Sequence, residues 1–429
     1  MDKKDPRYQM YVSILREELL LAMGCTEPAA VAYCAALARS LLDAPEKIQH
    51  CTLLVSGNII KNVKSVVVPN TCGMKGLKTA VAAGAAEGDE TAGLQVLSHI
   101  GPSQQPNIQA FLERCPIEVL PAESPKIFYI EVTLFTDRET ARVVIEDYHT
   151  NVTVMEHNGH AEMRDIRCGD CAAPEQSQTD RTRMNVEDIL DFAATADLTD
   201  VQEVLDRQIQ RNMAISEEGL RGQWGAQVGR TMMKAATSRY QRAAAAAAAG
   251  SDARMSGCEL PVVIVSGSGN QGLTASVPVI ICAREMEAGE DALLRALLVS
   301  NLITIHQKTG IGRLSAFCGA TSAGVGAACG IAWLEGGRYQ EIAHTIVNSL
   351  AILSGMVCDG AKPSCAAKIA TAVTNGLLGY QMFCNGLEFF DGDGIVTKGV
   401  ENTIANVGRL ANRGMRQTDR EILNIMTGR

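Results

Sequence analysis

The sequence predicts an α+β fold, with a small mixed α/β part that holds a β-sheet, followed by a mostly α-helical part. Segments rich in β-branched residues lie in the first part of the chain, whereas the sequence after Met184 has almost continuous helical character. Apolar residues make up 46% of the 429 residues, which is enough for a sizeable core. Only 4% are aromatic and 39 are glycine, so we expect a core of small side chains at close backbone approach.

The first part, residues 1–183, combines helical and strand patterns. Leu15, Leu19 and Met23 share one helical face, and β-branched residues flank the polar turn at 137–140. In order, we expect a helix over 8–43 that breaks at 24–28, strands over 51–55 and 59–68, helical structure over 75–115 interrupted at Pro102 and Pro106, and a hairpin of 127–136 with 141–156. This part should therefore carry the small sheet.

The second part, residues 184–429, is expected to be the helical, catalytic part, and the polar residues 165–185 to be a linker. The alanine run at 243–249 favours a helix, since alanine has the highest helix propensity. In order, we expect helices over 186–194, 201–219 and 227–250, a short strand over 261–265, a glycine-rich turn over 266–272, and successive small-residue helices over 275–411.

Charge and hydropathy exclude two classes of partner. The formal net charge is −9, whereas a nucleic-acid binder needs a basic face. No uninterrupted apolar run reaches the roughly 18 residues that a membrane span needs. The first residues carry mixed charge and no apolar segment of a signal peptide, so we expect a cytoplasmic protein. Helices rich in glycine and alanine are compatible with a homo-oligomer.

The chain has 14 cysteines, and a reducing compartment disfavours disulfides. Most should be small core residues, and some should serve metal binding or catalysis. Cys25, in the segment Gly24-Cys-Thr-Glu-Pro28, should lie just before a helix amino terminus. Unpaired N–H groups there lower the pKa of a thiol, which makes Cys25 a candidate nucleophile or base. The alternative is an incidental cysteine in a helix joint.

Cys318, Cys358 and Cys365 form a second candidate set. Gly360 and Pro363 favour a loop that could turn Cys358 and Cys365 toward one point. Three thiolates without a fourth fit a site left open for substrate, such as a [4Fe-4S] cluster with one iron free to act as a Lewis acid. The alternative is that these are buried core cysteines.

The glycine-rich turn at 266–272 follows a short apolar strand and opens a helix. Such a turn directs backbone N–H groups at an anion, either a phosphate or a carboxylate. Its glycines satisfy Gly-x-Gly-x-x-Gly, but the βαβ unit of a dinucleotide site is absent, so we favour a carboxylate. Lys75, in the turn at 70–76, could meet a substrate carboxylate or be a solvated surface lysine.

His157, His160, Cys168 and Cys171 have the residue types of a zinc site. The order, histidines before cysteines with a short gap, is not that of a standard zinc finger. A polar, variable loop is the alternative, and the sequence does not assign these residues a role.

Taken together, the segments at 24–28, 70–76, 267–272, 318–324 and 358–365 resemble the L-cysteine desulfidase family over nearly the whole chain. The second part also resembles, more distantly, the α-chain of iron–sulfur L-serine dehydratases. The resemblance implies that Cys318, Cys358 and Cys365 hold a [4Fe-4S] cluster and that Cys25 is the catalytic base. It implies that the glycine-rich turn, with Ser268, Asn270 and Gln271, binds the carboxylate of a small amino acid. Lys75 remains a further candidate for that contact from its own turn.

The function implied is β-elimination of L-cysteine to pyruvate, ammonia and hydrogen sulfide. An L-serine or L-threonine dehydratase with the same cluster is the alternative within enzymes, since no residue decides thiol against hydroxyl. Outside enzymes, the sequence is also compatible with a non-catalytic metal or redox-sensing protein and with a metal-free globular protein. We expect no nucleic-acid or membrane partner.

Overall fold

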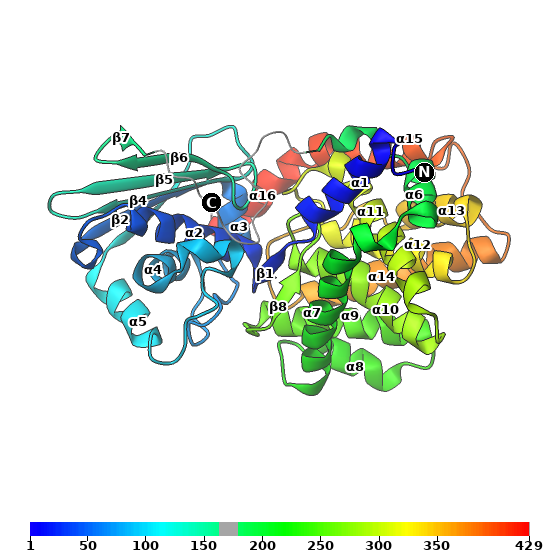
Figure 1. Cartoon of the computed structure of the whole chain (residues 1–429), viewed down its shortest axis with the longest axis horizontal. Coiled ribbons are helices and arrows are strands. Elements are labelled where there is room, and N and C mark those ends of the chain that lie inside the picture. Colours follow the sequence, from blue (N-terminus) through cyan, green and yellow to red (C-terminus); the bar gives the residue numbers. More distant parts are fainter. Residues whose placement is uncertain (163–178, 429) are drawn as a thin grey trace.

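The computed structural model describes residues 1–162 and 179–428, and it confirms the α+β class. Figure 1 shows the β-sheet with α2, α4 and α5 at one end of the molecule and most other helices at the opposite end. The α-helices are α1 (Pro6–Glu18), α2 (Thr26–Ser40), α3 (Gly57–Val63), α4 (Leu77–Glu87), α5 (Gln105–Arg114), α6 (Val186–Thr195), α7 (Gln202–Arg221), α8 (Val228–Ala235), α9 (Arg239–Met255), α10 (Gly269–Glu285), α11 (Glu290–Ile311), α12 (Gly319–Leu334), α13 (Tyr339–Ile352), α14 (Cys365–Cys384), α15 (Val400–Arg409) and α16 (Arg416–Thr427). The strands are β1 (Leu21–Met23), β2 (His50–Val55), β3 (Ile117–Pro121), β4 (Tyr129–Phe135), β5 (Thr140–Glu146), β6 (Val152–His157), β7 (His160–Ala161) and β8 (Pro261–Val263).

The main sheet has the strand order β3-β2-β4-β5-β6-β7, in which only the pair β2–β3 is parallel. Every second residue of β2 is buried, namely Cys51, Leu53 and Val55, as the alternating pattern predicts. α2 packs against β4 and β5, and α4 packs against α2. A Cβ atom on Gly84 would come within 2.0 Å of the Ala32 carbonyl oxygen, so this helix pair needs a glycine at that point.

The structure corrects several expected elements. Residues 57–63 form α3 rather than a strand, because Ile59 and Val63 lie one helical turn apart and are both buried. The expected helix over 227–250 is divided into α8 and α9, and a capping box between Ser238 and Gln241 starts α9. Pro106 does not interrupt a helix but lies in the first turn of α5, where proline is tolerated.

The helical part packs through small side chains, as expected from the composition. The alanine run of α9 is fully buried, and α9 contacts α7, α10 and α14. A Cβ atom on Gly324 of α12 would lie 2.4 Å from the carbonyl group of Ala372 of α14. Within residues 1–162 and 179–428, no helix is both long and apolar enough to cross a bilayer.

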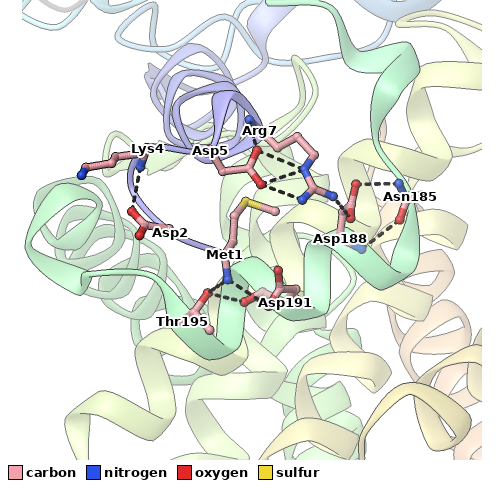
Figure 2. A network of polar contacts seen from close by, with 9 residues as sticks. All are labelled: Met1, Asp2, Lys4, Asp5, Arg7, Asn185, Asp188, Asp191 and Thr195. Carbon is pink, nitrogen blue, oxygen red and sulfur yellow. Dashed lines mark hydrogen bonds and ion pairs between the residues drawn. The ribbon is translucent and has the colours of Figure 1, made fainter.

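Elements near both ends of the chain cross between the two parts. β1 pairs antiparallel with β8, and α1 packs against α6. Figure 2 shows how the amino terminus is held there: the Met1 amine donates to Asp191 Oδ1 at 3.0 Å, and Arg7 Nη1 donates to Asp188 Oδ1 at 2.6 Å. α16 returns to pack on α3 of the first part. The boundary between residues 183 and 184 stays a prediction.

Candidate active site

One small cavity, of about 100 Å³, brings together residues that are far apart in the sequence. It is lined by nearly all the residues predicted to form the site: Cys25, Ser268, Asn270, Gln271, Cys318, Cys358 and Cys365. Lys75 is exposed and is not among the residues that line this cavity. The constellations recognised separately in the sequence are therefore parts of one site, with Lys75 outside it.

Helix amino termini converge on this cavity. Cys25 is the N-cap of α2, Ser268 is the N-cap of α10 and Cys318 is the N-cap of α12, while Cys365 is the first residue of α14. Each of these ends presents backbone N–H groups without helical partners and the positive end of a helix dipole. These helix ends direct partial positive charge at the cavity, which suits an anionic ligand.

A short ladder places two of the three cysteines side by side. Phe317 and Val357 form an antiparallel bridge, with the Cys318 N–H donating to Met356 O and the Cys358 N–H to Ala316 O, both at 2.7 Å. Cys318 and Cys358 each follow the bridged residue by one position, so both lie on the same face of this ladder, diagonally opposite. Cys365 follows Cys358 across a short loop, and its Sγ lies 3.7 Å from the carbonyl oxygen of Gly360 in that loop.

The donor set fits an iron–sulfur cluster. A hydrogen bond from Cys318 lowers the pKa of Cys358 to about 6, while the pKa of Cys318 is raised by that same bond and by burial. Cys358 is therefore the member of the pair that loses its proton first, and the thiolate is the form that binds iron. No cluster of three or more His, Cys, Asp or Glu side chains in the described residues is arranged to hold a single metal ion. The ligands of a cluster each bind a different iron, so they need not converge on one point.

Cys25 and Glu27 form a buried pair that also lines the cavity. The Cys25 thiol donates to Glu27 Oε2 across 3.1 Å. Burial and then the Glu27 charge raise the pKa of Cys25 well above its ordinary value. The lowered thiol pKa expected from the helix terminus is therefore wrong for this structure, because desolvation of a fully buried thiol outweighs the helix dipole.

Glu27 is the ionised member of the pair. Its Oε2 also accepts from Thr26 Oγ1 at 3.0 Å, and its Oε1 accepts from Asn62 Nδ2 at 3.0 Å. Burial alone would raise the pKa of Glu27, but the neighbouring His149 and the hydrogen bonds from Cys25 and Thr26 lower it. Burial lowers the pKa of His149 to about 4, so this imidazole carries a charge that acts on Glu27 only in acid. At neutral pH the hydrogen bonds from Cys25 and Thr26 favour the Glu27 carboxylate.

The glycine-rich turn is fixed against α2, since Thr26 Oγ1 also lies 3.0 Å from Gly267 O. Gly267 has φ +77°, and a Cβ there would come within about 3 Å of both His149 and Arg313. Gln271 is buried with its Oε1 unpartnered among the described residues, and it packs on Gly319 at the start of α12. The turn therefore joins the ends of α2, α10 and α12.

Of the four residues with the types of a zinc site, the structure describes the two histidines. His157 and His160 are paired across β6 and β7, and His157 Nε2 lies 3.2 Å from Glu139 Oε1. Cys168 and Cys171 lie outside the described residues. None of the lining residues of the cavity comes from β6 or β7.

Sequence reasoning missed several charged residues that line the cavity, namely Glu27, Arg254, Lys308 and Arg313. Glu27 lies inside a recognised motif and could have been found there. The others lie within helices or just after one, where a single basic residue gives no signal of burial. A second, larger cavity of about 700 Å³ adjoins the first and shares Lys308, Arg313 and Leu314 with it.

Comparison with known proteins gives a consistent picture. A model of the family described as serine dehydratase alpha chain matches residues 91–424. The UPF0597 protein of Desulfitobacterium hafniense is 54% identical over 428 residues, which covers 99% of this chain and 98% of that protein. UPF0597 proteins of Finegoldia magna and Treponema denticola are 44% and 42% identical and cover 97% and 98% of this chain, and 99% and 98% of their own.

Proposed function

Because this chain belongs to the serine dehydratase alpha-chain family, we propose that it is a [4Fe-4S]-dependent lyase that eliminates the β-substituent of a small amino acid, with L-cysteine as its substrate. The family points to a lyase-type enzyme. The observation that carries the proposal is the convergence of Cys318, Cys358 and Cys365 with the Cys25–Glu27 pair in one cavity. The reaction would convert L-cysteine and water into pyruvate, ammonia and hydrogen sulfide.

Cys318, Cys358 and Cys365 would hold the cluster through their thiolates. When bound, the cluster supplies an iron without a protein ligand, which acts as a Lewis acid toward the leaving group. The positive helix termini and the neighbouring Lys308, buried beside Cys318 and Cys358, would offset the negative charge of the thiolates.

Cys25 would remove the proton at the α-carbon of the substrate. The Cys25–Glu27 pair holds its proton on sulfur, so the pair can accept one more proton through the Glu27 carboxylate. Cys25 would pass its own proton to Glu27 Oε2 and take the α-proton on Sγ. Burial of the pair excludes water, which strengthens the interactions that guide this transfer.

L-serine is the second candidate substrate, and the description of the matching family favours it. The proposed site would bind L-cysteine and L-serine through the same groups, since both carry an α-carboxylate, an α-proton and a β-substituent that iron can bind. The choice therefore depends on the leaving group, thiol or hydroxyl, and only turnover distinguishes them.

The test is anaerobic reconstitution with iron and sulfide, followed by separate assays of pyruvate and sulfide from L-cysteine, L-serine and L-threonine. A brown protein that makes pyruvate and sulfide from L-cysteine supports the proposal, while pyruvate from L-serine alone selects the dehydratase. Cys318→Ala should lose iron, whereas Cys329→Ala, at a fully buried cysteine of the same helix outside the cavity, should retain it. A colourless wild-type protein without turnover contradicts both candidates.

A further inference from the structure

Arg254, near the end of α9, is a buried cation with no ion-pair partner in the part of the chain that the structure describes. Its side chain lines the cavity and the residue is only 2% exposed. The guanidinium makes one hydrogen bond, from Nη1 to Asn270 Oδ1 at 3.1 Å. Nε and Nη2 are buried and have no hydrogen-bond partner among the described residues. Leaving a charge unpaired in the interior costs several kcal/mol, so such a group is expected to meet an anion.

The two unpartnered atoms form one binding edge. Nε–H and Nη2–H point the same way from the planar guanidinium, and together they match the two oxygens of a carboxylate. The third nitrogen is held by Asn270, whose Oδ1 also accepts from Ser251 Oγ at 3.2 Å. Asn270 therefore fixes the orientation of the guanidinium and leaves its bidentate edge free.

The position of Arg254 also requires an anion. A Cβ atom on Gly269, the first residue of α10, would lie 2.4 Å from Arg254 Nε, so the guanidinium lies directly against this helix terminus. A cation at the positive end of a helix dipole is unfavourable, and an anion that contacts the guanidinium beside the helix terminus relieves both charges. Glu27, the acidic residue among those that line the cavity, already accepts hydrogen bonds from Cys25, Thr26 and Asn62.

We propose that Arg254 binds the α-carboxylate of the substrate through Nε and Nη2, and that Asn270 acts as its positioning residue. This inference rests on the proposed function for the identity of the amino acid, but the need for a carboxylate follows from the free guanidinium edge. Held there, the ligand would have its α-carbon near Cys25, whose thiol is close enough to Arg254 to sense its charge. Cys318 and Cys358, which the proposed function assigns to the group that binds the β-substituent, line the same cavity.

The site is therefore selective for carboxylates among compounds with the same β-substituent. L-cysteine and cysteamine differ only in the carboxylate, and so do L-serine and ethanolamine. Loss of a bidentate, charge-assisted contact in a buried site should weaken amino-acid binding about 10- to 100-fold. The binding of the amines should be unaffected by changes at Arg254.

The test measures dissociation constants for these pairs by calorimetric titration under anaerobic conditions, with and without iron reconstitution, alongside KM and kcat. In Arg254→Gln, amino-acid binding should weaken and KM should rise by that factor, while amine binding is unchanged. Arg254→Lys keeps the charge but lacks the edge and should bind with intermediate affinity. Arg284→Gln is the matched control, since Arg284 is half exposed, lies outside the cavity and pairs with Glu217 at 3.6 Å.

Arg254→Gln removes an unpaired buried charge, so its thermal midpoint should be no lower than that of the wild type. Turnover with unchanged KM in Arg254→Gln would overturn the inference and leave the proposed function standing. Amino-acid binding that depends on Arg254 without turnover of any amino acid would uphold the inference and remove the proposed function. Equal binding of amino acids and amines by the wild type, or binding of neither, would also overturn the inference.

Discussion

At the scale of single residues, the Cys25–Glu27 pair sets the acid–base chemistry of the site. The pKa of Cys25 lies well above its ordinary 9.0, and the pKa of Glu27 lies below its ordinary 4.5. At any pH between the two pKa values the thiol is protonated and the carboxylate is ionised. The pair can therefore accept one proton, on Glu27, throughout this pH range. Glu27 loses that capacity only as the pH falls through its lowered pKa.

Glu27→Gln should reduce kcat about 10²- to 10⁴-fold, because the amide accepts the hydrogen bond from Cys25 but cannot accept its proton. Cys25→Ser should have a similar effect, since a serine hydroxyl is a far weaker base. Titration of this pair should leave the wild-type kcat unchanged between about pH 5.5 and 8. The kcat should fall on acidification only below pH 4.5, where Glu27 becomes protonated. Steady-state kinetics of the reconstituted enzyme across pH measure both effects.

Two variants control this prediction. Glu285→Gln changes a glutamate that pairs with Arg242 at the surface, and Cys34→Ser changes a buried cysteine of α2 that faces Val143 O rather than the cavity. Both should keep the wild-type kcat. Retention of full activity by Glu27→Gln, with normal iron content, would remove Glu27 from the proton path.

At the scale of elements, close packing of α12 on α14 sets the spacing of the cluster cysteines. Cys318 caps α12 and Cys365 begins α14, so any shift between these helices moves the two thiols relative to each other. The helices approach through Gly324 and Gly376: a Cβ on Gly376 would lie 2.4 Å from Gly324 O. Backbone atoms cannot move aside as a flexible side chain can.

Gly324→Ala should destabilise the protein by about 1–3 kcal/mol, since the added methyl meets the Ala372 backbone at 2.4 Å. It should also lower the iron bound per chain after reconstitution, because the helix ends that carry the cysteines move apart. Urea unfolding and an iron assay measure the two effects. Gly289→Ala is the control, since no atom lies within 4 Å of its added Cβ, and wild-type iron content in Gly324→Ala would contradict the spacing argument.

At the scale of the whole molecule, each end of the chain packs on the part to which it does not belong in sequence: α1 packs on α6 of the helical part, and α16, the last helix, packs on α3 of the sheet part. Figure 1 shows the amino terminus beside α6 and α15 of the helical part. Lys61 of α3, only 2% exposed, donates to Asp419 Oδ1 of α16 at 2.5 Å. The Lys61 carbonyl oxygen lies so close to Gly360 that a Cβ there would come within 2.3 Å, which connects α16 to the cysteine loop.

Asp419→Asn should lower the free energy of unfolding by about 2–4 kcal/mol, because it leaves the buried Lys61 ammonium without its counter-charge. The loss should appear in urea unfolding at neutral pH. Asp147→Asn breaks the exposed pair with Lys126 and should change stability little. If the two variants proved equally stable, the link between α16 and α3 would contribute nothing to the assembly of the two parts.

The sequence by itself determined the fold class, most helices, and the motifs at 24–28, 266–272, 318–324 and 358–365, because helical periodicity and glycine-rich turns are local features. It misassigned α3, since β-branched residues fit both a strand and a short buried helix. These local signals also placed Cys25 at a helix amino terminus.

Only the tertiary structure decided that these motifs share one cavity and that Lys75 lies outside it. It also reversed the expected pKa shift of Cys25, because burial depends on what packs around the thiol rather than on its neighbours in sequence. Arg254 reaches the site from the end of a helix whose sequence carries no motif. Its unpaired charge exists only once the chain is folded, because desolvation and the lack of a counter-ion are properties of three-dimensional packing.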